Sequence, residues 1–304
     1  MKIFFLINFV FLSFTLSIFS FDRIKEDYFL KIDSGNSFAD VKEKLSKKNI
    51  FFPNLIKFLF LVTNKDQDLR IGEYLIKKQD SSLKIALKIL TNDVDYRSLY
   101  IPEGSKSTDF LTNNQIESFC NYKNISKCNL DGFFHPNTYL YEFYEDFNEV
   151  LNRAFNMQLS YLENYYNETN NSLVKDSFEL LIIASIIEKE SCRNEMSQVA
   201  GVIYNRLRDN MKLQIDSTVI YGVKNFDGNL TKKHLKTDNA YNSYLNFGLP
   251  PTPISNPSLN AIKASTKPDD HKFLYFVKKE KCLHEFSTNY EDHLAAVNKF
   301  QINK

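Results

Sequence analysis

The sequence predicts an α+β protein whose larger domain is built around a buried helix. The deciding observation is the segment Leu180–Ile187, which contains eight residues without a charge. A segment that is apolar on all sides is typical of a helix buried inside a domain. Asp176 and Ser177 lie just before it and suit a helix start. Short segments that alternate polar and apolar residues, such as Tyr28–Asp33, add the strands.

The first residues predict a membrane anchor. Between Lys2 and Asp22 lie nineteen residues without a charge, and a helix of that length just spans a bilayer at about 1.5 Å per residue. No small-x-small cleavage pattern precedes Asp22, so we expect the segment to be retained rather than removed as a signal peptide. Residues 1–21 are therefore expected to cross the membrane, with the rest of the chain outside.

A small module of strands and helices is expected over residues 22–95. Its apolar positions follow strand and helix periods, and Ser37 suits the start of the first helix. It contains no cluster of His, Cys or acidic residues, so we expect it to bind or space something rather than to catalyse. The expected elements are strands at 28–33 and 71–76 and helices at 38–48, after Pro53 and at 81–90.

Residues 96–304 are expected to form one larger domain around the buried helix. Its expected strands lie at 96–102, 273–277 and 284–288, with an edge strand or a strand leading into a short helix at 213–222. Loops are expected at 131–141 and, rich in proline, at 248–257. The expected helices are one capped by Ser107 or Thr108, then 143–166, 195–209 and 258–265, and a last one with a capping box formed by Thr288 and Glu291.

Composition excludes some classes of function. The 304 residues are 43% hydrophobic and 25% charged, which is typical of a globular protein, and the net charge of +1 gives no electrostatic case for binding nucleic acid. No CxxC motif or Cys/His cluster is present, so no metal site is expected. Cys120 and Cys128 are close enough to close a small loop by a disulfide. Free buried thiols are at least as consistent with Cys192 and Cys282.

Two carboxylates stand at the end of the apolar segment, Glu188 and Glu190. A carboxyl group at the end of a buried helix is desolvated, which raises its pKa and keeps it protonated near neutral pH, as a general acid requires. The simpler interpretation is that the helix surfaces there and that Glu188, Lys189 and Glu190 form a solvated tip. Taken alone, this stretch favours the simpler interpretation.

The motifs that follow reverse that preference. Read in order, the chain closely resembles the endolytic murein transglycosylase (YceG-like) family. The resemblance runs from the anchor nearly to the C-terminus and is densest over residues 180–290. The motifs that carry it are Ala184–Ser191, Val202–Leu207, Leu213–Gly222, Tyr241–Tyr244, Gly248–Pro251 and His284–Thr288, with Ile101–Gly104 and Gly132–Tyr139 as additional matches.

This resemblance implies a single-pass inner-membrane protein with a LysM-like module and, outside the membrane, a catalytic domain with a lysozyme-like helical core. It implies endolytic cleavage of nascent peptidoglycan glycan strands between MurNAc and GlcNAc, which leaves 1,6-anhydro-MurNAc ends. Cell-wall synthases are the implied partners, and an end to glycan strand elongation is the implied role. No cofactor is expected.

The resemblance also assigns the acid. In the motif Glu-Lys-Glu-Ser the second glutamate, Glu190, is the implied catalytic residue. Helix geometry does not choose between Glu188 and Glu190, because the helix is apolar all round. The residues expected to bind the substrate or to hold Glu190 in place are Gln214, Asp216, Tyr241, Asn242 and His284, with Tyr244 as a second aromatic candidate. A purely structural role is about as consistent with each of these residues.

One carboxyl group suffices for the implied reaction. Most glycosidases need two, because one must activate water or attack the sugar. A lytic transglycosylase uses the C6 hydroxyl of its own substrate as the nucleophile. Glu190 would then act first as an acid on the glycosidic oxygen and afterwards as a base on that hydroxyl.

The chain departs from the family pattern at four positions that leave Glu190 in place. Ser217 replaces a frequent Pro, Thr252 a usual Gly, Asn137 an Asp and Asp131 a Glu. Two other functions remain open at this stage. One is a membrane-anchored, non-enzymatic scaffold that binds peptidoglycan and recruits synthases. The other is a hydrolase in which Asp216 or Glu188 supplies a second carboxylate.

Overall fold

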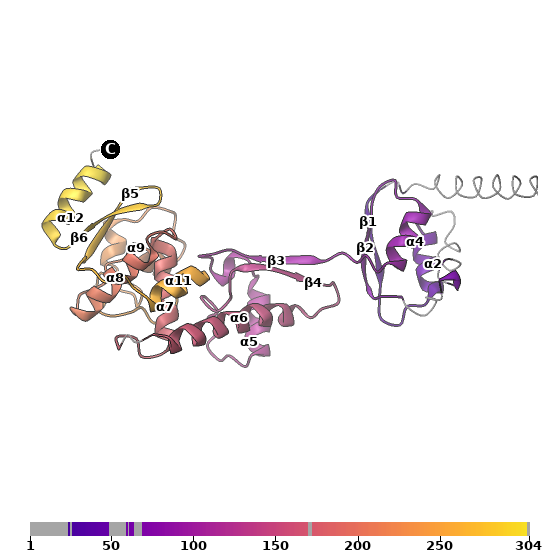
Figure 1. Cartoon of the computed structure of the whole chain (residues 1–304), viewed down its shortest axis with the longest axis horizontal. Coiled ribbons are helices and arrows are strands. Elements are labelled where there is room, and N and C mark those ends of the chain that lie inside the picture. Colours follow the sequence, from indigo (N-terminus) through magenta and orange to yellow (C-terminus); the bar gives the residue numbers. More distant parts are fainter. Residues whose placement is uncertain are drawn as a thin grey trace, which may run out of the picture. The chain divides into compact units, whose positions relative to one another are not determined.

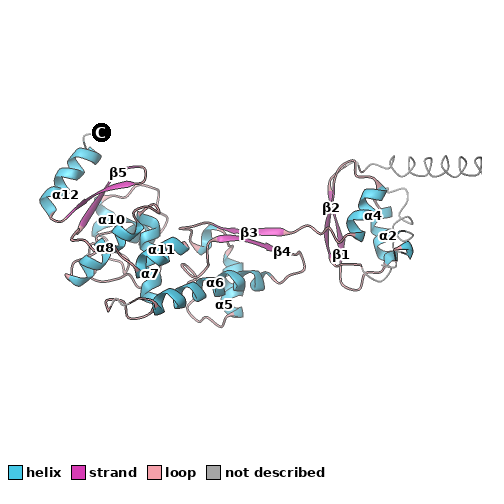
Figure 2. Cartoon of the chain, viewed as in Figure 1, coloured by secondary structure: helices cyan, strands magenta, loops and turns pink. Residues whose placement is uncertain are grey.

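The computed structural model describes residues 24, 26–48, 59, 61–63, 69–169 and 172–302. The expected anchor lies outside these residues, as does nearly all of the helix expected after Pro53. Within the described ranges, no helix combines the length and the apolar character that crossing a membrane requires. The chain forms two compact units, which Figures 1 and 2 draw. One consists of residues up to Leu99 with Leu140–Asp146, and the other of Tyr100–Tyr139 with the residues from Phe147 onward.

The first unit is a two-stranded sheet covered by helices. Strands β1 (Tyr28–Ile32) and β2 (Gly72–Ile76) are antiparallel, with Tyr28 opposite Ile76. Helices α2 (Phe38–Ser46) and α4 (Ser82–Leu90) lie against one face of this sheet (Figure 1). Alternate residues of β1 are buried, as expected for a strand with one covered face. The core residues include Leu30, Ile32, Val41, Leu45, Tyr74, Ile76, Ile85 and Ile89.

A second two-stranded sheet, β3 (Arg97–Ile101) with β4 (Asn137–Tyr141), forms where the sequence predicted a strand and then a loop. The strand β4 was missed because Pro136 and Asn137 are turn residues, whereas Tyr139 and its neighbours suit a strand once β3 pairs with them. The helix expected to start at Ser107 or Thr108 also begins later. Ser107–Asp109 is a 3₁₀ turn, and Thr112 caps α5 (Asn113–Tyr122).

Helix α7 (Ser177–Glu190) is the centre of the second unit. Asp176 caps it by accepting a hydrogen bond from the Glu179 amide at 2.8 Å. Each residue of Leu180–Ile187 is at most 3% exposed, which confirms a helix buried on all sides. It contacts α6 (Phe147–Asn167), α8 (Met196–Arg208), α9 (Asp216–Gly222) and α11 (Leu259–Thr266).

The one polar residue inside the buried segment, Ser185, attaches the proline-rich loop to α7. Its hydroxyl accepts a hydrogen bond from the Ile254 amide at 3.0 Å, and its carbonyl accepts one from the Ser255 hydroxyl at 3.0 Å. Buried polar groups need such partners, because an unpaired one costs about 1–3 kcal/mol. The loop that leads into α11 is therefore fixed directly on the central helix.

The C-terminal part adds α10 (Lys232–Lys236), the antiparallel hairpin of β5 (Tyr275–Glu280) and β6 (Leu283–Ser287), and α12 (Tyr290–Val297). The predicted capping box of Thr288 and Glu291 is wrong. Asn289 caps α12 instead, and its Oδ1 accepts from the Asp292 amide at 2.9 Å. Leu213–Ile215 is not a strand, and the helix α9 follows it directly. The fold is thus of the mixed α+β type.

All four cysteines form disulfides. Cys120 pairs with Cys128 and Cys192 pairs with Cys282, with Cα–Cα distances of 5.8 and 5.4 Å. The second bond corrects the view of Cys192 and Cys282 as free buried thiols. It could not be deduced from the sequence, because the two residues are 90 positions apart and meet only when the β5–β6 hairpin packs beside the end of α7.

We expect the two disulfides to contribute unequally to stability. Their loops span 90 and 8 residues, and loop-closure entropy gives about 4–5 kcal/mol for the longer and about 2–3 kcal/mol for the shorter. The double variant Cys192→Ser/Cys282→Ser should therefore lower the free energy of unfolding, measured with urea, by more than the matched variant Cys120→Ser/Cys128→Ser. Equal losses would contradict the entropic account.

Candidate active site

The last turn of α7 presents two glutamates whose surroundings differ. Glu188 is held by the start of α11, where its Oε2 accepts from the Ser258 amide at 2.9 Å and from the Ser258 hydroxyl at 2.6 Å. Burial raises the pKa of Glu188, and the two bonds from Ser258 work against that rise. Because Ser258 is also the N-cap of α11, Glu188 links two helices and its Oε2 is already occupied.

Glu190 is the last residue of α7 and is partly buried. Burial is the largest cause of its raised pKa, and the nearby charge of Asp216 raises it further. The hydroxyl and amide of Ser217 and the charge of His284 act in the opposite direction and favour the carboxylate. Glu190 therefore tends to hold its proton, while it has neighbours that accept its charged form once the proton has left.

Ser217 stands out among these neighbours. Its Oγ is buried and makes no aligned hydrogen bond with any group in the described ranges, although its hydroxyl lies close enough to Glu190 to lower the pKa of that carboxyl. A buried hydroxyl without a partner is unfavourable unless something else uses it. Ser217 is thus a hydroxyl beside the acid that can turn toward either Glu190 or a ligand.

Asp216 and Tyr244 form a pair next to Glu190. The Tyr244 hydroxyl donates to Asp216 Oδ1 at 2.7 Å, and Asp216 is exposed. Burial, the bond to Asp216 and the charges of Asp216 and Glu190 all raise the pKa of Tyr244. Tyr244 therefore stays a hydrogen-bond donor at neutral pH and holds the Asp216 carboxylate in position.

Gln214 is placed by Arg206, a residue that the sequence analysis left unassigned. The buried guanidinium of Arg206 donates to Gln214 Oε1 at 3.1 Å and to the carbonyls of Lys212 and Leu213 at 2.9 Å. Gln214 also adopts a φ of +52°, in the left-handed region that non-glycine residues rarely occupy. Such strain persists only where surrounding bonds enforce it, and Arg206 supplies them here.

The side chains of two predicted binding residues make hydrogen bonds within the protein. Asn242 is fully buried, and its amide nitrogen donates to the Thr237 carbonyl at 2.8 Å while its Oδ1 accepts from the Tyr244 amide at 3.0 Å. The Tyr241 hydroxyl lies 2.8 Å from Thr252 Oγ1. Asn242 thus shapes the loop that carries Tyr244, and the prediction that Tyr241 and Asn242 bind the substrate stays a prediction.

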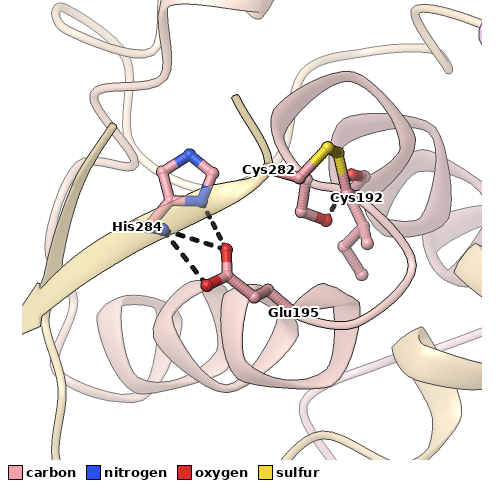
Figure 3. Close-up of a disulfide and its surroundings, with 6 residues drawn as sticks. Cys192, Glu195, Cys282 and His284 are labelled. Atoms are coloured by element: carbon pink, nitrogen blue, oxygen red, sulfur yellow. Dashed lines mark hydrogen bonds and ion pairs between the residues drawn. A yellow bond between two sulfur atoms is a disulfide. The ribbon is translucent and has the colours of Figure 1, made fainter. Parts of the chain in front are cut away.

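His284, on β6, is held by Glu195, at the start of α8. Nδ1 of His284 lies 2.7 Å from Glu195 Oε2, and the main-chain amide of His284 donates to both carboxylate oxygens at 3.1 Å (Figure 3). Glu195 could not be recognised from the sequence, because an acidic residue at a helix start is ordinary. Only its partner 89 residues away gives it significance.

The structure thus brings Asp216, Ser217 and His284 into the surroundings of Glu190, whereas Glu188 is hydrogen-bonded to Ser258 at the start of α11. In the part of the chain that the structure describes, no group of three or more His, Cys, Asp or Glu side chains could hold a metal ion. What the arrangement offers chemically is the carboxyl group of Glu190, with a raised pKa, close to a second carboxylate, a hydroxyl and an imidazole.

Comparison with known proteins places the chain in a family. The model of the YceG-like family matches residues 30–299. The chain belongs to the YceG-like family. A crystal structure of a YceG-like protein from Listeria monocytogenes superimposes on it with a TM-score of 0.59 and 25% sequence identity, covering 89% of this chain and 98% of the other.

Curated relatives of this YceG-like protein carry the name endolytic murein transglycosylase. The one from Bacillus subtilis is 34% identical over 180 residues, which are 59% of this chain and 49% of the relative. The one from Streptococcus pneumoniae D39 is 25% identical over 312 residues, covering 86% of this chain and 56% of the relative. This chain therefore spans about half the length of the curated relatives that it matches.

We expect Ser217→Ala to raise the pKa of Glu190 further. The substitution removes a hydroxyl that favours the charged form, while the Ser217 amide remains. The pKa can be followed by ¹³C NMR of the glutamate carboxyl carbons, with Glu190→Gln to assign the signal. The matched control is Ser258→Ala, which should raise the pKa of Glu188 and leave that of Glu190 unchanged. An unchanged Glu190 signal in Ser217→Ala would contradict the assignment.

We also expect Glu190→Gln to stabilise the folded protein at neutral pH. Because the pKa of Glu190 is raised on folding, wild type loses stability as the pH rises from the ordinary glutamate value of about 4.3 toward the folded value. Glutamine does not titrate, so the variant should have the higher free energy of unfolding at pH 7. The gap should close at pH 4. A variant that is less stable than wild type at pH 7 in urea unfolding contradicts this account.

Proposed function

We propose that this YceG-like protein is an endolytic peptidoglycan lytic transglycosylase with Glu190 as its acid and base. The observation that carries the proposal is the contrast at the end of α7. Both glutamates have a raised pKa, but Oε2 of Glu188 accepts two hydrogen bonds from Ser258, whereas Glu190 has Asp216, Ser217 and His284 as its neighbours. The names of the Bacillus and Streptococcus relatives support the same reaction.

The reaction needs one group that gives a proton and then takes one back. The protonated Glu190 donates to the glycosidic oxygen between MurNAc C1 and GlcNAc, and the C1–O bond breaks. The Glu190 carboxylate then removes the proton from the MurNAc C6 hydroxyl, and O6 closes on C1 to give the 1,6-anhydro ring. Glu190 ends the cycle protonated, so no water and no second carboxyl group are consumed.

The surroundings of Glu190 suit both halves of this cycle. Burial and Asp216 favour the protonated form that starts it, and Ser217 and His284 favour the carboxylate that exists between the two proton transfers. A base that operates near neutral pH benefits from such opposing influences, because neither form is then strongly preferred. For Gln214, which Arg206 holds, and Asp216, which Tyr244 holds, we propose a role in binding the sugar.

Hydrolysis is the second candidate, and Asp216 is the observation that favours it. Asp216 is exposed and close enough to Glu190 to influence its pKa, so it could activate a water molecule as the second carboxylate of a hydrolase does. The products separate the two reactions, because hydrolysis leaves reducing ends and transglycosylation leaves anhydro ends.

The proposed setting is the outer face of the plasma membrane. The uncharged segment at 3–21 supports an anchor, and two disulfides support an oxidising compartment. For the first unit, with its β1–α2–β2–α4 order, we propose the LysM-like role of binding glycan. Nascent glycan strands would be the substrate, cell-wall synthases the partners, and the end of strand elongation the result.

We expect Glu190→Gln to abolish glycan cleavage. Full-length protein in detergent should release muropeptides with 1,6-anhydro ends from peptidoglycan, as mass spectrometry reports, and Glu190→Gln should release none because glutamine cannot supply the proton. The matched control Glu188→Gln should keep most of the activity.

Three outcomes would overturn the assignment in different ways. Full activity of Glu190→Gln would remove Glu190 from its role. Reducing ends in place of anhydro ends would show a hydrolase. Binding of peptidoglycan without any release of muropeptides by wild type would show the non-enzymatic scaffold.

A further inference from the structure

Glu195 begins α8 but does not cap it. It occupies the N-cap position, and its side chain makes no hydrogen bond to the first turn of that helix. Asp, Asn, Ser and Thr at this position satisfy the free amides, which stabilises a helix by about 1 kcal/mol, and glutamate is not among these residues. In this structure the carboxylate is directed to His284 instead, and both side chains are only 9% exposed.

All three contacts of the Glu195 carboxylate that the structure shows go to one residue. Oε2 lies 2.7 Å from Nδ1 of His284, and the two oxygens share the His284 main-chain amide at 3.1 Å each. Figure 3 shows the other ring nitrogen, Nε2, on the side of the ring that faces away from Glu195. A carboxylate only accepts hydrogen bonds, so Nδ1 must carry a hydrogen.

The surroundings of His284 restrict the ring further. Phe276 and Phe286 lie beside it with centroid distances of 5.4 and 6.2 Å. The disulfide of Cys192 and Cys282 joins the same two segments, since Cys192 lies between Glu190 and Glu195 and Cys282 lies two residues before His284. The disulfide and the Glu195 carboxylate together fix the hairpin of β5 and β6 against the end of α7.

We propose that Glu195 is a positioning residue, which holds His284 with Nδ1 protonated and leaves Nε2 free to act within electrostatic reach of Glu190. The inference rests on the proposed function, because the orientation of His284 matters only if Glu190 changes its charge during the reaction. When Glu190 has given its proton to the leaving oxygen, its carboxylate lies near Asp216, a like charge. Only the imidazolium form of His284, with a hydrogen on both ring nitrogens, can offset that repulsion by its charge, and Glu195 holds the ring in place for it.

If Glu195 positions His284, the reaction depends on the carboxylate at residue 195. Where a carboxylate holds a metal-binding histidine, removing the carboxylate lowers metal affinity or activity about 10- to 100-fold, because the ring loses its orientation and basicity. A loss of similar size is expected here in kcat, with KM little changed, because the contacts of the Glu195 carboxylate that the structure shows all go to His284. A merely structural residue would affect the amount of folded protein and not the state of the His284 ring.

The test combines kinetics with the tautomer of His284. Glu195→Gln keeps an oxygen that can accept both hydrogen bonds but removes the charge, and Glu195→Ala removes both. We expect kcat for release of anhydro muropeptides to fall about 10- to 100-fold in both. Long-range ¹H–¹⁵N spectra, assigned with His284→Gln, should show Nδ1 protonated in wild type, and Glu195→Ala should shift the ring toward the Nε2-protonated form.

The matched control is Glu285→Gln on the same hairpin, where Glu285 pairs with Lys279 at 3.1 Å and is 44% exposed. It should leave kcat and the His284 tautomer unchanged. The proposal is overturned if Glu195→Gln keeps wild-type kcat, or if wild-type His284 lacks a hydrogen on Nδ1. If Glu195→Ala does not fold, the kinetic measurement on Glu195→Gln alone tests the proposal. If wild type releases no anhydro muropeptides, the proposed function fails, and the tautomer measurement still decides whether Glu195 sets the ring.

Discussion

The complete burial of α7 is the constraint on which the rest of the structure depends. Because each residue from Leu180 to Ile187 is almost inaccessible, neighbouring helices must surround this helix rather than pack on one side of it. At about 1.5–3 kcal/mol for each fully buried Leu or Ile side chain, it is a major source of apolar burial in its unit. A helix fixed from every side also fixes the direction of its last turn, which is how an ordinary glutamate acquires a defined position.

Features with local signals could be predicted from the sequence. The eight uncharged residues of α7 and the caps Asp176 and Ser37 are examples, since a helix start depends on side chains within four positions. The strand β4 and the true cap of α12 were missed for the opposite reason. β4 exists because β3 pairs with it, and Asn289 competes with Thr288 for a role that both residue types can fill.

The candidate site also combines features that the sequence indicates with features that depend on residues far apart in the sequence. The motif points to Glu190, but the difference between Glu188 and Glu190 comes from Ser258, which is 70 positions from Glu188. Asn242 and Tyr241 are residue types that bind sugars, yet their polar atoms are engaged by nearby loops. Glu195 gave no signal at all, because an acidic residue before a helix is common and its partner is far away in the sequence.

The position of Cys282 and His284 near the end of the chain sets the order in which the site can be assembled. Glu190 lies on a helix that packs against its neighbours in sequence, α6 and α8, and against the more distant α11, whereas the disulfide-linked hairpin must close a loop of 90 residues. Closing so long a loop is entropically unfavourable and comes late in folding. A chain interrupted before residue 282 therefore contains the acid without the imidazole, so the complete site exists only once nearly the whole unit has folded.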